Sequence, residues 1–401
     1  MCFLAFVSVL IPMMSTDAVG LNMDVVPSVR LEEGWNSNVY DTPINEVSSF
    51  GTRLTPALAL RFTSQDNAMI QVSGNYENIW YYDAQAKDAN SHTWFVRVDS
   101  SGAWGLTPTL SMVPSVYYLN TTNASRRTQL VPSGDPVLPP VSITNYGSTN
   151  TEDFGGALNF EYLATQNVII GVGGSYTEQR FTDSLPGSGL TDSSTAGGTA
   201  SVSYIFSPRT RLGIIAAGTH QTYQNSPDAD TMFGGILFGY QFSPAFSLYG
   251  TFGMSHIRQS EAPGIPSQSE SKPSGRFNIL YVRETFTARA YGSADYYGGG
   301  GFGAATRQWT AGLDFTDQFT VNWSWNLSGA YQVSQSVFET DAVDLTTIYG
   351  TGRLRYQLLS WASLDLTGNL NRQRSNGQFG ETLDLYTVLV GISIEKPYRI
   401  Y

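Results

Sequence analysis

The chain has 401 residues, a formal net charge of -11 at pH 7, 41% hydrophobic residues and a single cysteine, Cys2. A nucleic-acid partner would need a basic face, which this charge argues against, and a mature chain that begins after Cys2 has no disulfide or thiolate metal site. After the first few positions no run of eighteen uninterrupted apolar residues occurs, which excludes a helical membrane protein.

The N-terminus reads as a targeting segment. Residues 2–14 are apolar and are followed by small residues up to Ala18, which resembles the core and cleavage region of a secretory signal peptide. The basic residues that normally precede such a core are missing. We therefore expect residues 1–18 to be a signal peptide with a truncated start and residues 19–401 to be the functional domain. A buried N-terminal helix is the alternative, and Pro12 counts against it.

The first part of that domain alternates strictly. Between residues 25 and 40, Val29 and Leu31 share one face with other apolar residues, while Arg30 and Glu32 share the opposite face. Successive side chains of a β-strand point to opposite faces, so this period of two predicts a strand. Residues 52–62 alternate in the same way and predict its antiparallel partner.

The same unit recurs to the end of the chain. Short turns are expected near residues 63–67, 105–108, 164–167, 207–210, 243–245, 283–285, 316–318 and 360–362. Longer polar connections are expected near residues 41–49, 84–91, 121–150, 184–192, 224–230, 260–274, 298–305, 337–343 and 374–381. Eight short turns and nine long connections predict eighteen strands with both termini on the short-turn side; sixteen strands is the alternative count.

Residues 319–331 show the polarity of these strands most clearly. Large apolar residues such as Trp323, Trp325 and Leu327 occupy one face, and small polar residues occupy the other. Apolar residues that face lipid and polar residues that face a wet interior are typical of a transmembrane β-barrel. The fold class expected is therefore an all-β, antiparallel, up-and-down barrel.

Aromatic residues gather at both predicted strand ends, as rings at a membrane–water interface do. Beside the connections of the long kind lie Trp80 to Tyr82, Tyr117 and Tyr118, and Tyr296 and Tyr297. Beside the short turns lie Phe62, Tyr204, Phe206, Tyr240, Phe242, Phe246, Phe315, Phe319, Tyr356 and Trp361.

Charged residues collect on the polar face, where nine arginines stand against six acids. The candidate pore-lining residues are Arg30, Arg53, Arg61, Arg97, Arg276, Arg289, Arg307, Arg353, Arg355, Glu77 and Asp365. One interpretation is a charged pore lining that prefers anions, because guanidinium groups stay charged and bind carboxylates. The other is that these residues pair with one another and stiffen the barrel.

The longest connection, residues 121–150, contains four prolines together with Arg126, Arg127 and Asp135. In general porins a loop in the first third of the barrel folds inward and narrows the pore. By that resemblance these three residues are candidates for a constriction; a loop that stays outside the barrel is the alternative.

No catalytic, metal or cofactor site is expected. The three histidines, His92, His220 and His256, all fall on the lipid-facing side of the alternation, and no serine, histidine and aspartate combination emerges. Residues 298–303 fit a glycine-rich dinucleotide pattern formally, but no buried parallel strand precedes them and no helix follows. A glycine-rich loop is the better interpretation.

The start of the domain resembles a known family. Residues 27–42 contain a strand led by Pro27, with Gly34 and Asn38 in a Gly-x-x-x-Asn spacing, and residues 54–62 form a second strand that carries Pro56. This combination resembles the β-barrel porin 2 family of Gram-negative bacteria. The resemblance implies an outer-membrane barrel, in some relatives encoded near surface-polysaccharide systems, and it transfers no ligand residues. The end of the chain departs from the usual barrel terminus, because Pro397 interrupts the last alternating strand.

Two functions follow as expectations: a porin-like channel for passive diffusion of small polar or anionic solutes, or an accessory barrel of a surface-polysaccharide export system. The expected partners are outer-membrane lipids with lipopolysaccharide, the barrel-assembly machinery and, for the second function, export components. No cofactor is expected.

Overall fold

The computed structural model describes residues 22–41, 46–64, 68–101, 103–122, 149–182, 191–261, 266–297, 305–338, 344–375 and 382–400. Most of these residues lie in antiparallel strands. The strands are β1 (Asn22–Asn36), β2 (Ser49–Thr63), β3 (Met69–Tyr81), β4 (Ser91–Ser101), β5 (Trp104–Thr107), β6 (Leu110–Thr121), β7 (Asn150–Thr165), β8 (Val168–Thr182), β9 (Ser193–Ser207), β10 (Thr210–Tyr223), β11 (Ala229–Ser243), β12 (Phe246–Gln259), β13 (Gln268–Arg283), β14 (Phe286–Tyr297), β15 (Thr306–Asp317), β16 (Trp323–Ser336), β17 (Asp344–Leu359), β18 (Ala362–Ser375), β19 (Leu383–Glu395) and β20 (Tyr398–Arg399).

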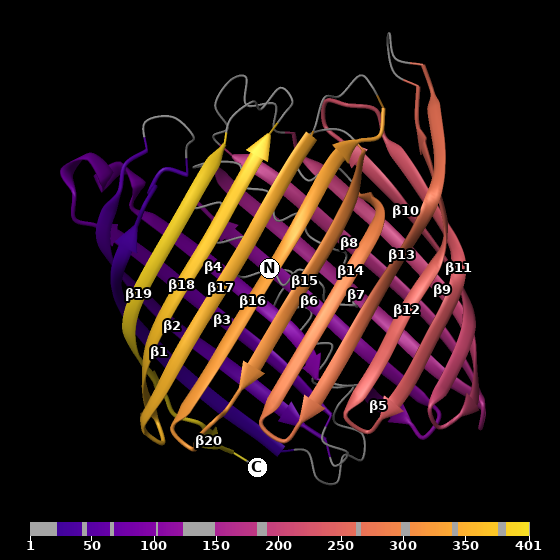
Figure 1. Ribbon diagram of the computed structural model, residues 1–401, viewed down its shortest axis with the longest axis horizontal. Helices are drawn as coiled ribbons and strands as arrows, with labels where there is room; N and C mark the ends of the chain where they lie inside the picture. Colours follow the sequence, from indigo (N-terminus) through magenta and orange to yellow (C-terminus); the bar gives the residue numbers. More distant parts are fainter. Residues whose placement is uncertain are drawn as a thin grey trace.

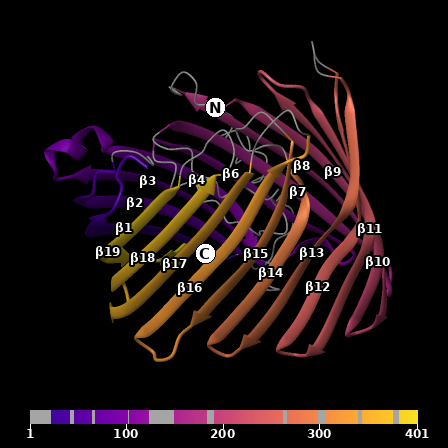
Figure 2. The ribbon, with the colours of Figure 1, turned by 45° about the horizontal axis from the view of Figure 1, so that its top comes forward.

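The sheet closes on itself. Neighbouring strands along the chain pair with each other, and β1 pairs with both β2 and β19. Strands β4 and β5 together form one span, because both pair with β6, and β20 continues β19. The described strands therefore make eighteen spans of a closed antiparallel barrel, as the spacing of turns predicts (Figures 1 and 2).

The break between β4 and β5 is a local irregularity in this ladder. Val98 pairs with Val116 and Trp104 pairs with Met112. The chain therefore advances six residues from β4 to β5 while β6 advances only four. Extra residues of this kind form a bulge that bends a strand and increases its twist. The sequence indicates a turn nearby but not this bulge.

Strand β19 shows how the alternation produces a wall. Val388, Val390 and Ile392 are exposed, Val390 to 57%, whereas the intervening Leu389 and Ser393 are buried at 6% and 9%. The same outward set of large apolar residues recurs on the other strands. An apolar outer surface and a mainly polar inner wall suit lipid outside and water inside. Closure leaves no unpaired strand edge in the lipid. The protein is therefore a transmembrane β-barrel.

The strand ends divide into two sets. Two-residue turns such as residues 166–167, 208–209 and 244–245 gather at one end of the barrel, here called the short-turn end, and the longer connections leave from the other end, here called the loop end (Figure 1). The backbone N–H of Ile400 donates to the carbonyl of Met23 at 2.9 Å. Both ends of the described chain thus lie side by side at the short-turn end, as predicted.

The predicted strand over residues 319–331 begins later than expected. Strand β16 begins at Trp323, and residues 318–322 form the turn that the sequence places at 316–318. Thr320 holds this turn, since its side-chain oxygen accepts a hydrogen bond from the Trp323 backbone N–H at 3.0 Å. Phe319 and Val321 continue the apolar period, so alternation alone does not mark where the strand starts.

The aromatic girdle at the short-turn end is confirmed as a chain of ring contacts. Tyr204 lies 4.8 Å from Phe206, and Trp323 lies 4.7 Å from Tyr356, measured between ring centroids. At the loop end the assignment is partly wrong. Trp80 and Tyr82 are exposed outward, but Tyr81, Tyr117 and Tyr296 are buried.

The end of the chain keeps the register of the last strand. Ser28 pairs with Glu395 and Val25 pairs with Tyr398. Both strands therefore advance three residues across the interruption at Lys396 and Pro397, and no residue is inserted. Proline has no N–H to donate to the ladder, which explains the interruption. Tyr398 and Ile400 therefore continue the outward apolar row of β19.

Helical structure in the described part of the chain is limited to a short 3-10 segment, η1 (Ala84–Ala89), which Asp83 caps by accepting a hydrogen bond from the Gln85 backbone N–H at 2.8 Å. None of the described helices has the length and apolarity needed to cross a membrane.

Candidate functional site

The inner wall of the barrel carries a cluster of charges centred on Asp365 of β18. Arg353 Nε donates to Asp365 Oδ1 at 2.9 Å and Arg355 Nε donates to the same oxygen at 3.0 Å. Both arginines lie on β17 two residues apart, so strand alternation turns them to the same face. The Asp365 side chain is fully buried, while Arg353 and Arg355 keep 29% and 30% of their side-chain surface exposed. The carboxylate is thus hidden and the guanidinium groups are not.

The same cluster reaches across the seam where β19 meets β1. Ser393 of β19 donates a hydrogen bond to Asp365 Oδ2, and Arg30 Nε of β1 donates to Ser393 Oγ at 3.1 Å. Three arginines, Arg30, Arg353 and Arg355, therefore gather around one carboxylate. We call Arg30, Arg353, Arg355, Asp365 and Ser393 the seam cluster.

A second ion cluster lies beside it, on β1, β2 and β3. Arg53 Nη2 lies 2.7 Å from Glu32 Oε2, and Arg53 Nε lies 3.9 Å from Glu77 Oε2. All three side chains are less than a tenth exposed. Arg53 and Glu77 are therefore placed inside the wall, where they bind its strands together.

Arg61 occupies the short-turn end of the same wall. It donates to Gln71 Oε1 at 2.9 Å and lies 3.3 Å from Glu395 Oε1. These three residues border a recess of about 200 Å³ between β1 and β4. The recess is polar on this side, because its lining also includes Ser73 and Asn75.

The remaining predicted residues are dispersed around the barrel. Arg97 lies 2.6 Å from Asp99 on β4, and Arg276 lies 3.4 Å from Asp295 on β14. Arg289 stacks on the ring of Tyr291 at 5.1 Å and is paired in register with Asp314. The structure thus gives most of the predicted arginines an acidic neighbour, and it leaves the seam cluster as the place where arginines outnumber acids.

The prediction that Arg307 lines the pore is wrong. Arg307 shares a face of β15 with Trp309 and Leu313, and Leu313 is exposed on the outer surface. Its guanidinium lies 4.7 Å from the centre of the Trp309 ring and donates to the Pro273 carbonyl at 3.4 Å. Arg307 therefore belongs to the outer face near the loop end, where a long side chain can keep its charge out of the lipid by reaching the interface.

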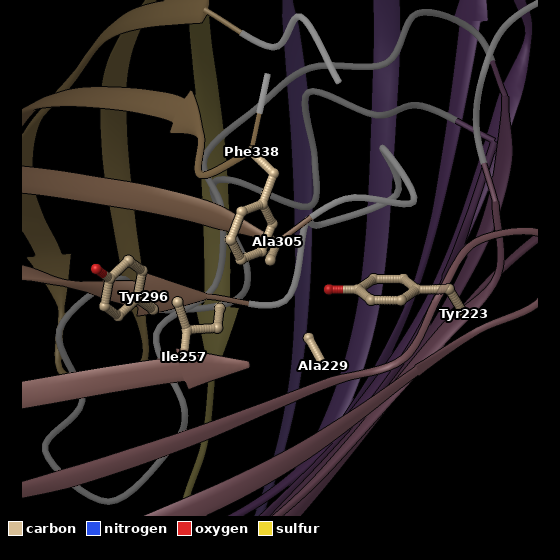
Figure 3. Close-up of a cluster of buried hydrophobic side chains, with 6 residues drawn as sticks. All are labelled: Tyr223, Ala229, Ile257, Tyr296, Ala305 and Phe338. Atoms are coloured by element: carbon tan, nitrogen blue, oxygen red, sulfur yellow. The ribbon is translucent and has the colours of Figure 1, made fainter. Parts of the chain in front are cut away.

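Two features of the inner wall were not predicted. One is Arg211, which lies 3.1 Å from Glu161 Oε1. The other is a buried apolar cluster at the loop end, formed by Tyr223, Ala229, Ile257, Tyr296, Ala305 and Phe338 (Figure 3). Ile257 gives the signal that could have found it, because an isoleucine there interrupts the inward row of Ser255 and Gln259. This cluster ties the ends of β10, β11 and β12 to those of β14, β15 and β16.

The three histidines lie on the outer face, as the alternation predicts: His220 pairs in register with Asp230, and His256 with Met232. Within the described ranges no group of three or more histidine, cysteine, aspartate or glutamate residues is placed to hold a metal ion. Residues 1–18 and the candidate constriction residues Arg126, Arg127 and Asp135 lie outside the described residues.

Comparison with known proteins gives structural likenesses only. No protein-family model matches the sequence, and no curated protein matches it. Among solved structures, OccK1 (OpdK) of Pseudomonas aeruginosa is 12% identical, with a TM-score of 0.42 over 94% of this chain and 99% of that chain. A BenF-like porin from Pseudomonas fluorescens Pf-5 is 11% identical, with a TM-score of 0.45 over 96% of this chain and 100% of that chain. OccAB1 of Acinetobacter baumannii is 10% identical, with a TM-score of 0.42 over 96% of this chain and 99% of that chain. The fold assignment rests on the strand pairing of this chain and not on these values.

Proposed function

We propose that this barrel is a channel for passive diffusion of small polar solutes across the outer membrane of a Gram-negative bacterium, with a preference for anions. The observation that carries the proposal is the seam cluster, in which three arginines surround one buried carboxylate. Its net positive charge belongs to a wall that alternation turns toward the barrel interior. A passing carboxylate would meet guanidinium groups that stay charged at every physiological pH.

The arrangement of Asp365 supports this preference. Because its side chain is fully buried, it holds Arg353 and Arg355 in place without presenting its own charge to the interior. Preorganised donors cost little to reorder when a solute arrives. Charged rings and rows of this kind determine which ions enter a pore.

The membrane location implies the remaining partners. The apolar outer face contacts outer-membrane lipids and lipopolysaccharide, and a closed barrel of this type requires the barrel-assembly machinery for insertion. Membership of the β-barrel porin 2 family remains a prediction from residues 27–62, and the role of Arg126, Arg127 and Asp135 in a constriction likewise remains a prediction.

The experiment is a reversal-potential measurement on the folded protein in planar bilayers under a potassium chloride gradient. We expect stepwise conductance with an anion-selective reversal potential. Replacing both Arg353 and Arg355 with glutamine should move that potential toward the cation side. Arg307→Gln is the control: it removes one positive charge from the outer face instead of the inner wall and should leave the potential unchanged.

Clear cation selectivity of the unmodified protein would overturn the anion preference. Folded protein that inserts but never conducts would instead favour an accessory barrel of a surface-polysaccharide export system, which need not conduct alone. Heat-modifiable migration on a gel establishes folding independently of conductance, so these outcomes can be told apart.

A further inference from the structure

A group of polar residues interrupts the apolar outer surface at the loop end of β10 to β13. It consists of His220, Asp230, His256, Arg258 and Ser271, here called the outer-rim patch. Asp230 of β11 pairs in register with both His220 of β10 and Arg258 of β12. His256 pairs in register with Ser271 of β13. Side chains of directly paired residues point to the same face, so the patch is continuous across four strands.

Arg258 is the free cation of this patch. Although Asp230 stands directly opposite it, the Asp230 carboxylate is engaged by His220, whose Nδ1 lies 2.7 Å from Asp230 Oδ1. Arg258 is exposed and makes no hydrogen bond or ion pair within the described part of the chain. Its guanidinium is therefore available to an anion from outside.

His256 offers a second donor on the same strand. It lies two residues from Arg258, so both side chains project from one face, about 7 Å apart along the strand. Ser271 Oγ lies 2.8 Å from His256 Nδ1. That contact occupies one ring nitrogen of this exposed side chain and leaves Nε2 for another partner. Arg258 and His256 together can reach oxygens of one phosphate group.

The position of the patch specifies the source of that phosphate. Directly toward the short-turn end, the same outward rows continue with Met232, Met254 and Phe252, which are exposed to 66%, 51% and 64%. These side chains are suited to acyl chains, and the cationic group sits at their upper boundary, where lipid headgroups begin. A soluble anion would gain no favourable contact from these apolar side chains.

We propose that the outer-rim patch binds a phosphate group of lipid A, the membrane anchor of lipopolysaccharide, with Arg258 and His256 on the phosphate and Met232 and Met254 against its acyl chains. The proposal depends on the outer-membrane location given above, with the longer connections at the cell surface as in other outer-membrane barrels, but not on conduction. Arginine binds phosphate through two parallel charge-assisted hydrogen bonds, which are the strong class of hydrogen bond. The site would fix one glycolipid beside β10 to β13.

The test is a titration of the folded, full-length protein in detergent with bisphosphorylated lipid A, measured as bound lipid by native mass spectrometry. We expect it to bind at least about tenfold more tightly than the same lipid with both phosphates removed, which corresponds to one charge-assisted hydrogen bond. Arg258→Ala should remove most of this difference, and Arg258→Lys should retain part of it. Folding of each variant is checked by heat-modifiable migration.

Arg283→Ala is the matched control. Arg283 lies on β13, next to β12, is exposed on the same outward alternation as Phe277, and sits at the short-turn end. Its loss should leave lipid A binding unchanged. Equal binding of the phosphorylated and dephosphorylated lipids, equal losses in the two alanine variants, or equally tight binding of phosphatidylglycerol would each overturn the proposal. None of these results would bear on conductance, which is measured separately.

Discussion

Replacing Asp365 with asparagine removes one negative charge and keeps the shape of the side chain. In the folded barrel this carboxylate accepts hydrogen bonds from Arg353, Arg355 and Ser393, which lie on the two strands that flank β18. Asparagine can accept at only one oxygen, and its amide group would face the donors that now surround Asp365. Arg353 and Arg355 then lose their common counter-ion.

The size of the stability loss in Asp365→Asn follows from how deeply the charged side chains are buried. Removing one member of a fully buried ion pair costs about 3–5 kcal/mol, because the other charge remains unpaired. Here the acid is fully buried, but the arginines keep 29% and 30% of their side-chain surface, so water can solvate them in part. We therefore expect Asp365→Asn to lower the free energy of unfolding by about 2–3 kcal/mol, between the buried and the exposed cases.

Two measurements test the effect of Asp365→Asn. Urea unfolding in lipid vesicles, followed by tryptophan fluorescence, gives the stability of Asp365→Asn, of Arg353→Gln and of the double variant. The double variant should lose less than the sum of the single losses, since the pair is coupled. In planar bilayers Asp365→Asn should shift the reversal potential further toward anions, because the carboxylate no longer partly neutralises the exposed guanidinium groups of Arg353 and Arg355. A loss below about 0.5 kcal/mol, typical of surface substitutions, or a shift toward cations would refute the role assigned to Asp365.

Three further changes test other parts of the fold by the same unfolding assay. Ile257→Ala should lower the free energy of unfolding by about 2–5 kcal/mol, because Ile257 is fully buried in the apolar cluster at the loop end; a loss within about 0.5 kcal/mol, as at surface positions, would contradict that packing. Val202→Arg on the outer face of β9 should cost about 2–4 kcal/mol in lipid, whereas Ser201→Arg, its inward neighbour, should cost clearly less; equal losses would mean that the alternation is misassigned. Glu284→Gly should stabilise the barrel by up to about 1 kcal/mol, since Glu284 has a φ of 31° in the turn between β13 and β14; a lower stability would show that its side chain matters more than its backbone.

The strand count and the outward face were predictable because both depend on local sequence. A period of two assigns Val390 and Leu389 to opposite sides without knowledge of any partner strand. Arg307 shows the limit of that rule. Alternation from Leu313 and Trp309 places Arg307 outward, whereas the rule that charges avoid lipid would place it inward. That second rule holds at the centre of the membrane and fails at a strand end, where Arg307 stacks on Trp309.

The pairing of charges could not be predicted, because it depends on which strands become neighbours and in what register. Arg61 meets Glu395 only because the barrel closes, and Arg276 meets Asp295 only where β13 and β14 are aligned. A count of nine arginines against six acids therefore overestimates the positive charge of the wall. The buried apolar cluster was missed for a related reason: its six residues come from the ends of different strands, and none belongs to a local pattern with another.

The position of the seam cluster also affects how the barrel folds. The hydrogen bond between Arg30 and Ser393 joins residues 363 positions apart, whereas β1 and β2 are joined by a connection of twelve residues. Closing a chain of the first length costs about 3 kcal/mol more conformational entropy than closing the second, from the logarithmic dependence on loop length. The β1–β19 ladder is therefore the least favourable pairing to form early, and the hairpins between consecutive strands are the most favourable. Once the last ladder forms, the seam cluster fastens it with charge-assisted bonds, so the residues proposed to attract solutes also lock the two ends of the chain together.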